Sequence, residues 1–115
     1  MKVKDVINEI NGKVLSCLEK QEDEFKGICS SDLLSFVMSR GNKKNGIVTV
    51  LNNVNVLAVA TLIEASCVII PSSIEVQDVI IKKANDEGVL IASTALSTYE
   101  VCGRIYNLEK AFDIL

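Results

Sequence analysis

Short polar segments follow the apolar runs of this sequence, and they contain hydroxyl and amide side chains with a single carboxylate, that of Asp32. Groups of this kind hold phosphates, carboxylates or nucleotide edges at helix N-termini, where backbone N–H groups and the helix dipole favour negative charge. The same residue types also cap helices without binding a ligand. The candidate ligand-binding residues are Ser31, Asp32, Asn52, Asn53, Ser72, Ser73, Ser93, Thr94, Ser97 and Thr98.

Residues for most catalytic chemistries are missing. Histidine is absent, which excludes Ser-His-Asp and Cys-His catalysis and all histidine-containing metal sites. Neither a Walker-type phosphate loop nor a Gly-x-Gly-x-x-Gly motif occurs. Asp32 is a candidate general acid or base together with the loop hydroxyls, but a carboxylate at that place also simply favours the start of a helix. We therefore expect a protein that is not an enzyme.

The four cysteines are far apart in the sequence and form no Cys-x-x-Cys pair. A metal or cluster site would have to be assembled from distant elements, and cysteines in apolar runs usually pack as small hydrophobic residues. We expect buried free thiols, no metal site and no cofactor. The cysteines are Cys17, Cys29, Cys67 and Cys102.

The charge balance argues against nucleic acid as a partner. Twelve Lys and Arg against fifteen Asp and Glu give a net charge of -3, whereas surfaces that bind nucleic acid are basic. No run approaches the roughly 20 apolar residues of a membrane span, so no membrane partner is expected. The segment 1–5 reaches an acidic residue before any hydrophobic run, unlike a secretory signal, and we expect a cytoplasmic protein.

Strands and helices alternate from residue 25 onward, and they position the polar segments. Runs of strand length lie at 25–29, 47–51, 67–70 and 89–92. Helices are expected at about 32–39, 54–64, 75–86 and 97–106. Repeated strand-helix-strand units imply parallel strands, so the loops that follow them gather at one edge of the sheet. Ligands of open α/β sheets bind outside that edge, near a reversal of strand order.

The first thirty residues add a helix and a short hairpin to this arrangement. Apolar residues recur at helical spacing over 3–10, and Asn11-Gly12 supplies a stop. The runs 13–19 and 25–30 have strand length and flank an acidic connector, which is typical of a loose hairpin. The sequence predicts a single α/β domain over 1–115. It has a largely parallel sheet of about four strands flanked by helices, with an N-terminal helix and a short hairpin-like strand.

Helix capping is the alternative interpretation of the polar loops. Two pairs fit the capping box, in which a hydroxyl accepts a backbone N–H and a carboxylate reaches back. They are Ser72 with Glu75 and Ser97 with Glu100. Ser31 and Asn53 fit single caps. Arg104 is expected to pair with Glu100 one helical turn away. The two interpretations are compatible, because a capped helix still has N–H groups for a ligand.

The predicted helix at 54–64 is apolar around most of its circumference, although a sheet covers only one side of a helix. The other side must be covered by a neighbouring helix or by a second copy of the protein. The apolar residues at the end of the chain also keep helical spacing, which predicts a helix to the last residue; they are Val101, Ile105, Leu108, Phe112 and Leu115. Together these features favour a homodimer.

Three short stretches resemble the DRTGG domain family. They are Ser-Asp-Leu-Leu-Ser at 31–35, Ser-Thr-x-x-Ser-Thr-x-Glu at 93–100 and Gly-Arg-Ile-Tyr at 103–106. The resemblance covers about residues 1–106 and leaves 107–115 as a C-terminal helical extension. It implies an α/β fold similar to the N-terminal domain of HPr kinase/phosphorylase. The sequence departs from the family pattern at 53–54 and 70–72, where Asn-Val and Ile-Pro-Ser replace Asp-Arg and Thr-Gly-Gly.

The resemblance implies a regulatory or dimerising role, because related domains lie between CBS domains in some pyrophosphatases or are attached to phosphotransacetylases. Stand-alone members are often encoded near components of iron-only hydrogenases. We expect a non-catalytic regulatory or ligand-sensing module that is dimeric. It binds a small polar or anionic metabolite, with nucleotides among the candidates, at the carboxyl edge of the strands. The alternative is a purely structural interaction module of a redox-linked or kinase-linked assembly.

Overall fold

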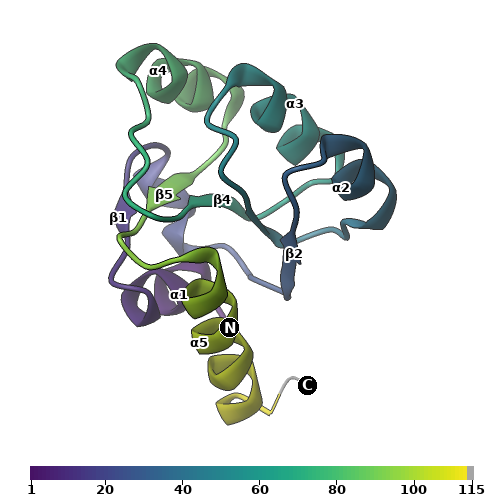
Figure 1. Cartoon of the computed structure of the whole chain (residues 1–115), viewed down its shortest axis with the longest axis vertical. Helices are drawn as coiled ribbons and strands as arrows, with labels where there is room; N and C mark the ends of the chain where they lie inside the picture. The colour runs from purple at the N-terminus through teal and green to yellow at the C-terminus, as the bar shows by residue number, and fades with distance from the viewer. Residues whose placement is uncertain (114–115) are drawn as a thin grey trace.

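The computed structural model describes residues 1–113 as one five-stranded sheet with helices on both faces (Figure 1). The strands are β1 (Lys13–Val14), β2 (Ile28–Ser30), β3 (Gly46–Val48), β4 (Cys67–Ile70) and β5 (Ile91–Ser93). The helices are α1 (Val3–Glu9), the 3-10 helix η1 (Leu18–Glu22), α2 (Leu34–Arg40), α3 (Val54–Leu62), α4 (Asp78–Glu87) and α5 (Thr98–Ala111).

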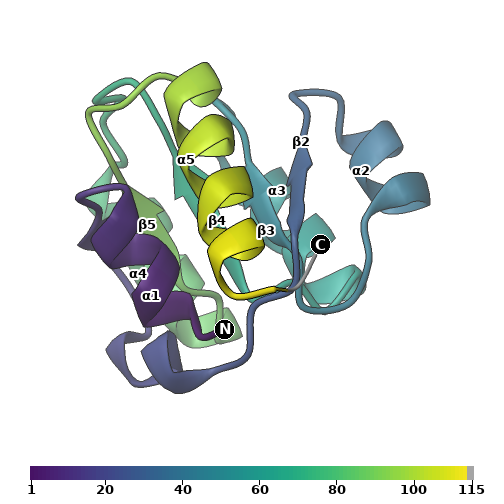
Figure 2. The ribbon, with the colours of Figure 1, turned by 90° about the horizontal axis from the view of Figure 1, so that it is seen from below.

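The strands from β2 to β5 are parallel, in the order β1-β5-β4-β3-β2. This confirms the predicted α/β fold class and the common direction of the four strands. Each crossover moves to the next strand in the same direction, which places α2, α3 and α4 on one face; α1 and α5 lie side by side on the other (Figure 2). The expected reversal of strand order is therefore absent from β2 to β5.

The predicted hairpin is wrong. The one strand within the segment 13–19 is β1, which pairs antiparallel with β5 at the opposite edge of the sheet from β2, and the segment then enters η1. Ser16 directs this pairing, because its hydroxyl donates to the Val89 carbonyl oxygen at 2.7 Å and accepts from Ile91 N at 2.8 Å. Since Ser16 is buried, loss of these bonds would leave polar groups without partners.

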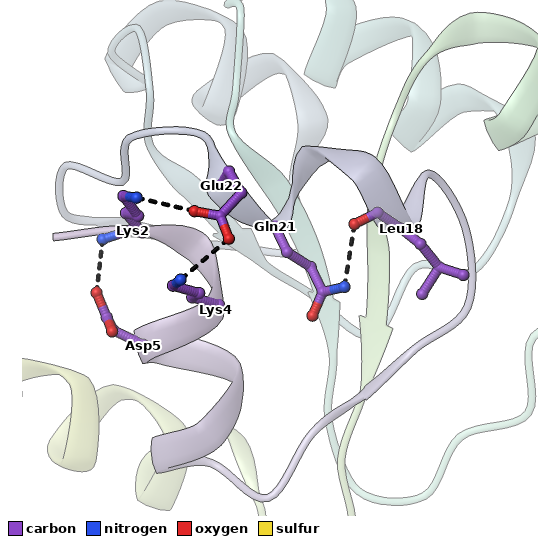
Figure 3. Close-up of polar contacts among 6 residues, drawn as sticks. All are labelled: Lys2, Lys4, Asp5, Leu18, Gln21 and Glu22. Atoms are coloured by element: carbon purple, nitrogen blue, oxygen red, sulfur yellow. Dashed lines mark hydrogen bonds and ion pairs between the residues drawn. The ribbon is translucent and has the colours of Figure 1, made fainter.

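An ion cluster fixes the segment that follows β1 against the start of α1 (Figure 3). The ammonium groups of Lys2 and Lys4 donate to the two carboxylate oxygens of Glu22 at 2.8 and 3.0 Å. Hydrogen bonds from both lysines lower the pKa of the Glu22 carboxyl below its usual value. Exposed pairs of this kind contribute little each, so the cluster mainly orients η1.

The apolar circumference of α3 is explained largely by its neighbours. Its buried residues pack on the sheet between α2 and α4; they are Val56, Leu57, Val59 and Ala60. Val54 and Leu62 stay 47% and 66% exposed. A neighbouring helix or a second copy of the protein was expected to cover the other side of α3. The neighbouring helices α2 and α4 make the contacts on its two sides. The exposed remainder of α3 is a narrow strip.

Several helix boundaries differ from those predicted. The helix α2 begins at Leu34 rather than at residue 32, and α4 begins at Asp78 rather than at 75. The last helix, α5, ends at Ala111. The prediction that this helix continues to the last residue of the chain is therefore wrong for residues 112–113. Leu115 lies outside the described residues. Gly88, with φ of 73°, ends α4 in the left-handed conformation, as predicted.

The cysteines are free thiols, as predicted. Cys17, Cys29 and Cys67 are buried, whereas Cys102 on α5 is half-buried. Burial raises the pKa of Cys67 to about 12. This thiol therefore stays protonated and packs as an apolar side chain. Across residues 1–113, no three Cys, Asp or Glu side chains come together as a group able to hold a metal ion, and no helix is both long and apolar enough to span a bilayer.

Candidate functional site

The loops that follow β2 and β3 are joined by Asp32. One carboxylate oxygen of Asp32 accepts from Thr49 Oγ1 at 2.8 Å and from Val50 N at 2.9 Å. This connection explains why α2 starts later than predicted, since the Asp32 side chain faces the neighbouring loop. Ser31 accepts from Leu33 N at 3.0 Å, two residues along the chain, and so shapes a turn rather than capping α2. Asp32 here stabilises two loops.

The loops that follow β3 and β4 are joined by Asn52. Its side-chain amide donates to the Glu75 carbonyl oxygen at 2.7 Å. The next residue, Asn53, caps α3 because its side-chain oxygen accepts from Asn55 N at 3.0 Å. The predicted cap is therefore confirmed. Both side-chain amides therefore form hydrogen bonds within the fold at this edge of the sheet.

The loops that follow β4 and β5 are joined through the backbone. Ser72 N donates to the Leu96 carbonyl oxygen at 2.7 Å, and Ser73 N donates to that of Thr94 at 3.0 Å. To make these bonds, Ser72 and Ser73 adopt left-handed φ angles of 63° and 55°. The chain turns here, and the predicted capping box of Ser72 with Glu75 is wrong. A left-handed conformation is unfavourable for a residue that carries a Cβ.

Ser73→Gly is expected to raise the free energy of unfolding by about 1 kcal/mol, because glycine adopts a left-handed φ without the Cβ clash. The matched change Ser35→Gly lies inside α2 and is expected to lower it by about 0.5 kcal/mol. Urea denaturation of both variants measures the two effects. If Ser73→Gly destabilised the protein as much as Ser35→Gly does, strain at Ser73 would be refuted.

The start of the loop after β5 is held by Thr94, which is 5% exposed. Its hydroxyl donates to the Ile10 carbonyl oxygen at 2.7 Å and accepts from Leu96 N at 3.2 Å. Thr94 thereby connects the end of α1 to the carboxyl edge of the sheet. The polar atoms of this residue are used structurally, and the residue is fixed in place.

The predicted capping box at the start of α5 is confirmed. The Ser97 hydroxyl accepts from Glu100 N at 3.2 Å, and the Glu100 carboxylate accepts from Ser97 N at 3.3 Å. Thr98 is the first residue of α5. The predicted pair of Arg104 with Glu100 is not formed; Arg104 instead donates to the Glu9 carbonyl oxygen at 3.3 Å, which links α5 to α1.

A crevice lies at the carboxyl end of β5, between the loop that follows β4 and the turn from α1 into β1. The chain leaves β4 for α4 on one face of the sheet and leaves β5 for α5 on the other face (Figure 1). The connections that follow β4 and β5 thus diverge, as they do at the switch points where ligands bind in open α/β sheets. We call this cavity of about 290 Å³ the β4–β5 crevice; it is lined by Asn11, Lys13, Ser73, Ile74, Ser93, Thr94 and Ala95.

Three of the ten predicted residues line the β4–β5 crevice, namely Ser73, Ser93 and Thr94. The other seven belong to the loops of the same edge, but they do not line it; they are Ser31, Asp32, Asn52, Asn53, Ser72, Ser97 and Thr98. Sequence analysis missed Asn11 and Lys13. Asn11 was interpreted only as a helix stop, and Lys13 reaches the crevice through the unexpected pairing of β1 with β5.

The residues that line the β4–β5 crevice carry groups of the kind that bind anions. Lys13 supplies an ammonium group, and Ser73 and Ser93 supply hydroxyls. No carboxylate is among the lining residues, so neither a carboxylate pair nor an acid–base pair is present there. Charge-assisted hydrogen bonds from such groups favour phosphate or carboxylate oxygens.

A second hollow of about 510 Å³ lies at the opposite edge, where the strands begin. Its charged lining contains two lysines and four carboxylates: Lys20, Lys44, Asp23, Glu24, Glu64 and Glu87. Glu24 holds Lys44 at 2.6 Å, and Glu64 and Glu87 lie 3.6 and 3.5 Å from the ammonium groups of Lys43 and Lys83. This hollow is acidic on balance, so its charge is less favourable to anions than that of the β4–β5 crevice.

The fold and the crevice define a small α/β domain with a polar, cation-bearing pocket at the carboxyl edge of a mostly parallel sheet. The family model of the DRTGG domain matches residues 5–108, and the chain belongs to this family. The resemblance seen in the sequence is thus confirmed. A search of curated proteins found no match.

The fold is also similar to a solved structure described as the CBS and DRTGG domains of the regulatory region of Clostridium perfringens pyrophosphatase, complexed with the activator diadenosine tetraphosphate. The TM-score is 0.72 at 9% sequence identity. The similarity covers 90% of this chain and 45% of that chain, so this chain spans less than half of that regulatory region. At this identity the likeness shows the fold.

Proposed function

We propose that this chain is a non-catalytic regulatory domain, one DRTGG domain over 1–115, that senses a small anionic metabolite in the β4–β5 crevice. One observation carries this function: three loop residues predicted from the sequence line a single cavity together with the ammonium-bearing Lys13. The absence of a carboxylate from that lining favours an anion over a cation.

The size of the cavity narrows the ligand class. At about 290 Å³ the crevice lies at the lower end of small-molecule sites, which run from roughly 300 to 1,000 Å³. It accommodates the phosphate or carboxylate end of a metabolite, while the rest of the ligand remains outside. The regulatory region of the Clostridium perfringens pyrophosphatase was solved with a phosphate-rich nucleotide activator, which supports phosphorylated metabolites as the first class to test.

Lys13→Met is expected to weaken the binding of diadenosine tetraphosphate or inorganic phosphate by about tenfold or more, because it removes a charge-assisted hydrogen bond. Isothermal titration calorimetry on the whole chain measures the dissociation constants. Lys82→Met is the matched control, since Lys82 lies on α4 and does not line the crevice. Equal weakening by both variants would assign the effect to net charge and contradict a site at Lys13.

We also propose that two copies of the chain associate. Large apolar and aromatic side chains stay exposed on α3 and α5, and exposed groups of this kind favour association. A regulatory domain that pairs can transmit ligand binding to whatever is fused or docked to it.

A structural interaction module is the second candidate, and the outer surface of α2 and α3 favours it. Apolar side chains stay exposed on these helices and at the residue before α2; they are Leu33, Phe36, Met38, Val54 and Leu62. If this second function is correct, the chain binds no anion in the β4–β5 crevice and does bind a specific protein partner. Phe36→Asp is then expected to abolish that complex, and Lys13→Met to leave it unchanged.

A further inference from the structure

The outer face of α5 carries large side chains that the fold leaves without cover. Tyr99 is 87% exposed and Tyr106 is 57% exposed. Gly103 lies between them at helical spacing, so the three residues share one face, which we call the α5 stripe. Together with Cys102 they border a shallow, largely apolar hollow of about 550 Å³. The opposite face of α5 packs into the core through Val101 and Ile105.

Nothing within the fold accounts for a glycine in the middle of this helix. Among residues 1–113 no atom lies within 4 Å of the place that a Cβ would take at Gly103, so the fold leaves room for a side chain there. Glycine is also the least favourable helix residue after proline. Its value on an open helix surface is to let another backbone approach closely. The exposed tyrosines on either side would then cover the flanks of that contact.

The α5 stripe is complementary to itself in an antiparallel arrangement. When two copies of α5 cross at a two-fold axis between Cys102 and Gly103, position 99 of each lies opposite position 106 of the other. Each Tyr99 then packs against Tyr106 of the second copy. Glu100 and Arg104 lie on one flank of the stripe, and the same axis brings each Glu100 near Arg104 of the second copy. Opposite charges therefore meet on both sides of the axis.

We infer that the α5 stripe is the contact between two copies of this chain. The inference rests on the dimer proposed above and names its surface, on α5 rather than on α3. A helix of 14 residues is about 21 Å long, so one helix pair gives an interface at the small end of the known range. The dimer is therefore a weak one that dissociates on dilution, which suits an association that a ligand regulates.

Sedimentation velocity on the whole chain, over a dilution series up to about 0.5 mM, tests the surface. Tyr99→Glu is expected to raise the dimer dissociation constant at least about tenfold. Leu62→Glu is the matched control, because it places the same charge at an exposed apolar position of α3. If Leu62→Glu dissociated the dimer and Tyr99→Glu did not, the contact through α5 would be wrong, although the proposal that the chain forms a dimer would stand. A wild-type chain that stays monomeric throughout would overturn both.

Cys102 provides a second readout that does not depend on a destabilising variant. It is the one half-buried cysteine, and it lies beside the proposed axis. Diamide takes two electrons and two protons from a pair of thiols, which join in a disulfide when their Cα atoms lie within about 7 Å. Wild-type chain is expected to give a covalent dimer on a non-reducing gel, and Cys102→Ser none. Equal yields from wild type and Tyr99→Glu would indicate random collision and contradict the contact.

Discussion

Replacing Gly46 with alanine is expected to lower the free energy of unfolding by about 2 to 3 kcal/mol. Gly46 begins β3 and is buried against Phe25, whose side chain is fully enclosed. A Cβ at this position would lie 2.5 Å from Phe25 Cε2 and 3.3 Å from Cys67 Sγ. The Phe25 ring cannot move away without opening the core beneath α1 and α5, so the clash distorts the sheet.

Gly103→Ala is the matched control for Gly46→Ala. At Gly103 a Cβ has open space, so alanine is expected to stabilise α5 by up to about 1 kcal/mol. Urea denaturation at low protein concentration, where the chain is monomeric, compares the two variants. If Gly46→Ala were neutral, the packing of Phe25 over the start of β3 would be incorrect.

Thr94→Val is expected to destabilise the protein by about 2 to 4 kcal/mol, because it removes the hydroxyl but keeps the shape. The hydroxyl donates to the Ile10 carbonyl oxygen and accepts from Leu96 N. Both backbone groups would lose their partner at a site where Thr94 itself is 5% exposed. The change also frees the loop after β5, so ligand binding in the β4–β5 crevice is expected to weaken with stability.

Thr61→Val is the control for Thr94→Val. The Thr61 hydroxyl donates to the Leu57 carbonyl oxygen within α3, on an exposed side of the helix, so its loss is expected to cost about 0.5 kcal/mol or less. Thermal unfolding followed by circular dichroism measures both variants. A Thr94→Val protein as stable as Thr61→Val would show that the hydroxyl does not hold α1 to the sheet edge.

Local sequence patterns were sufficient to predict the parallel part of the sheet, which contains four of its five strands. Apolar runs such as 67–70 alternate with helical segments, and such units pair in parallel for steric reasons. Asn53, Ser97 and Gly88 were predicted as helix ends because capping depends on residues within one turn. The position of the four loops at one edge followed from these local features.

Contacts between distant residues were not predictable in the same way. The strand β1 has only two residues, and its pairing depends on the buried bonds from Ser16 to the chain near β5, more than 70 residues away. The left-handed conformation of Ser72 and Ser73 depends likewise on carbonyl oxygens of the loop after β5. The local sequence around a serine at that place predicts a helix cap instead.

The candidate site likewise combines residues that local patterns predict with a residue that only a contact between distant segments brings there. Ser93 and Thr94 were found because they directly follow an apolar run of strand length. Lys13 was missed, because no local signal in a short polar segment shows that it will lie beside β5. The lysine on which the proposed anion site depends thus comes from a short strand that the sequence analysis did not place beside β5.

Nuclear magnetic resonance mapping of amide shifts during titration with diadenosine tetraphosphate tests the central claim most directly. A sensor that binds phosphate in the β4–β5 crevice should show saturable shifts at Asn11, Lys13, Ser73 and Ser93, and Lys13→Met should reduce them. Shifts gathered instead at the opposite edge, around Lys20 and Lys44, or no shifts with any phosphate-bearing ligand of a broad panel, would contradict it.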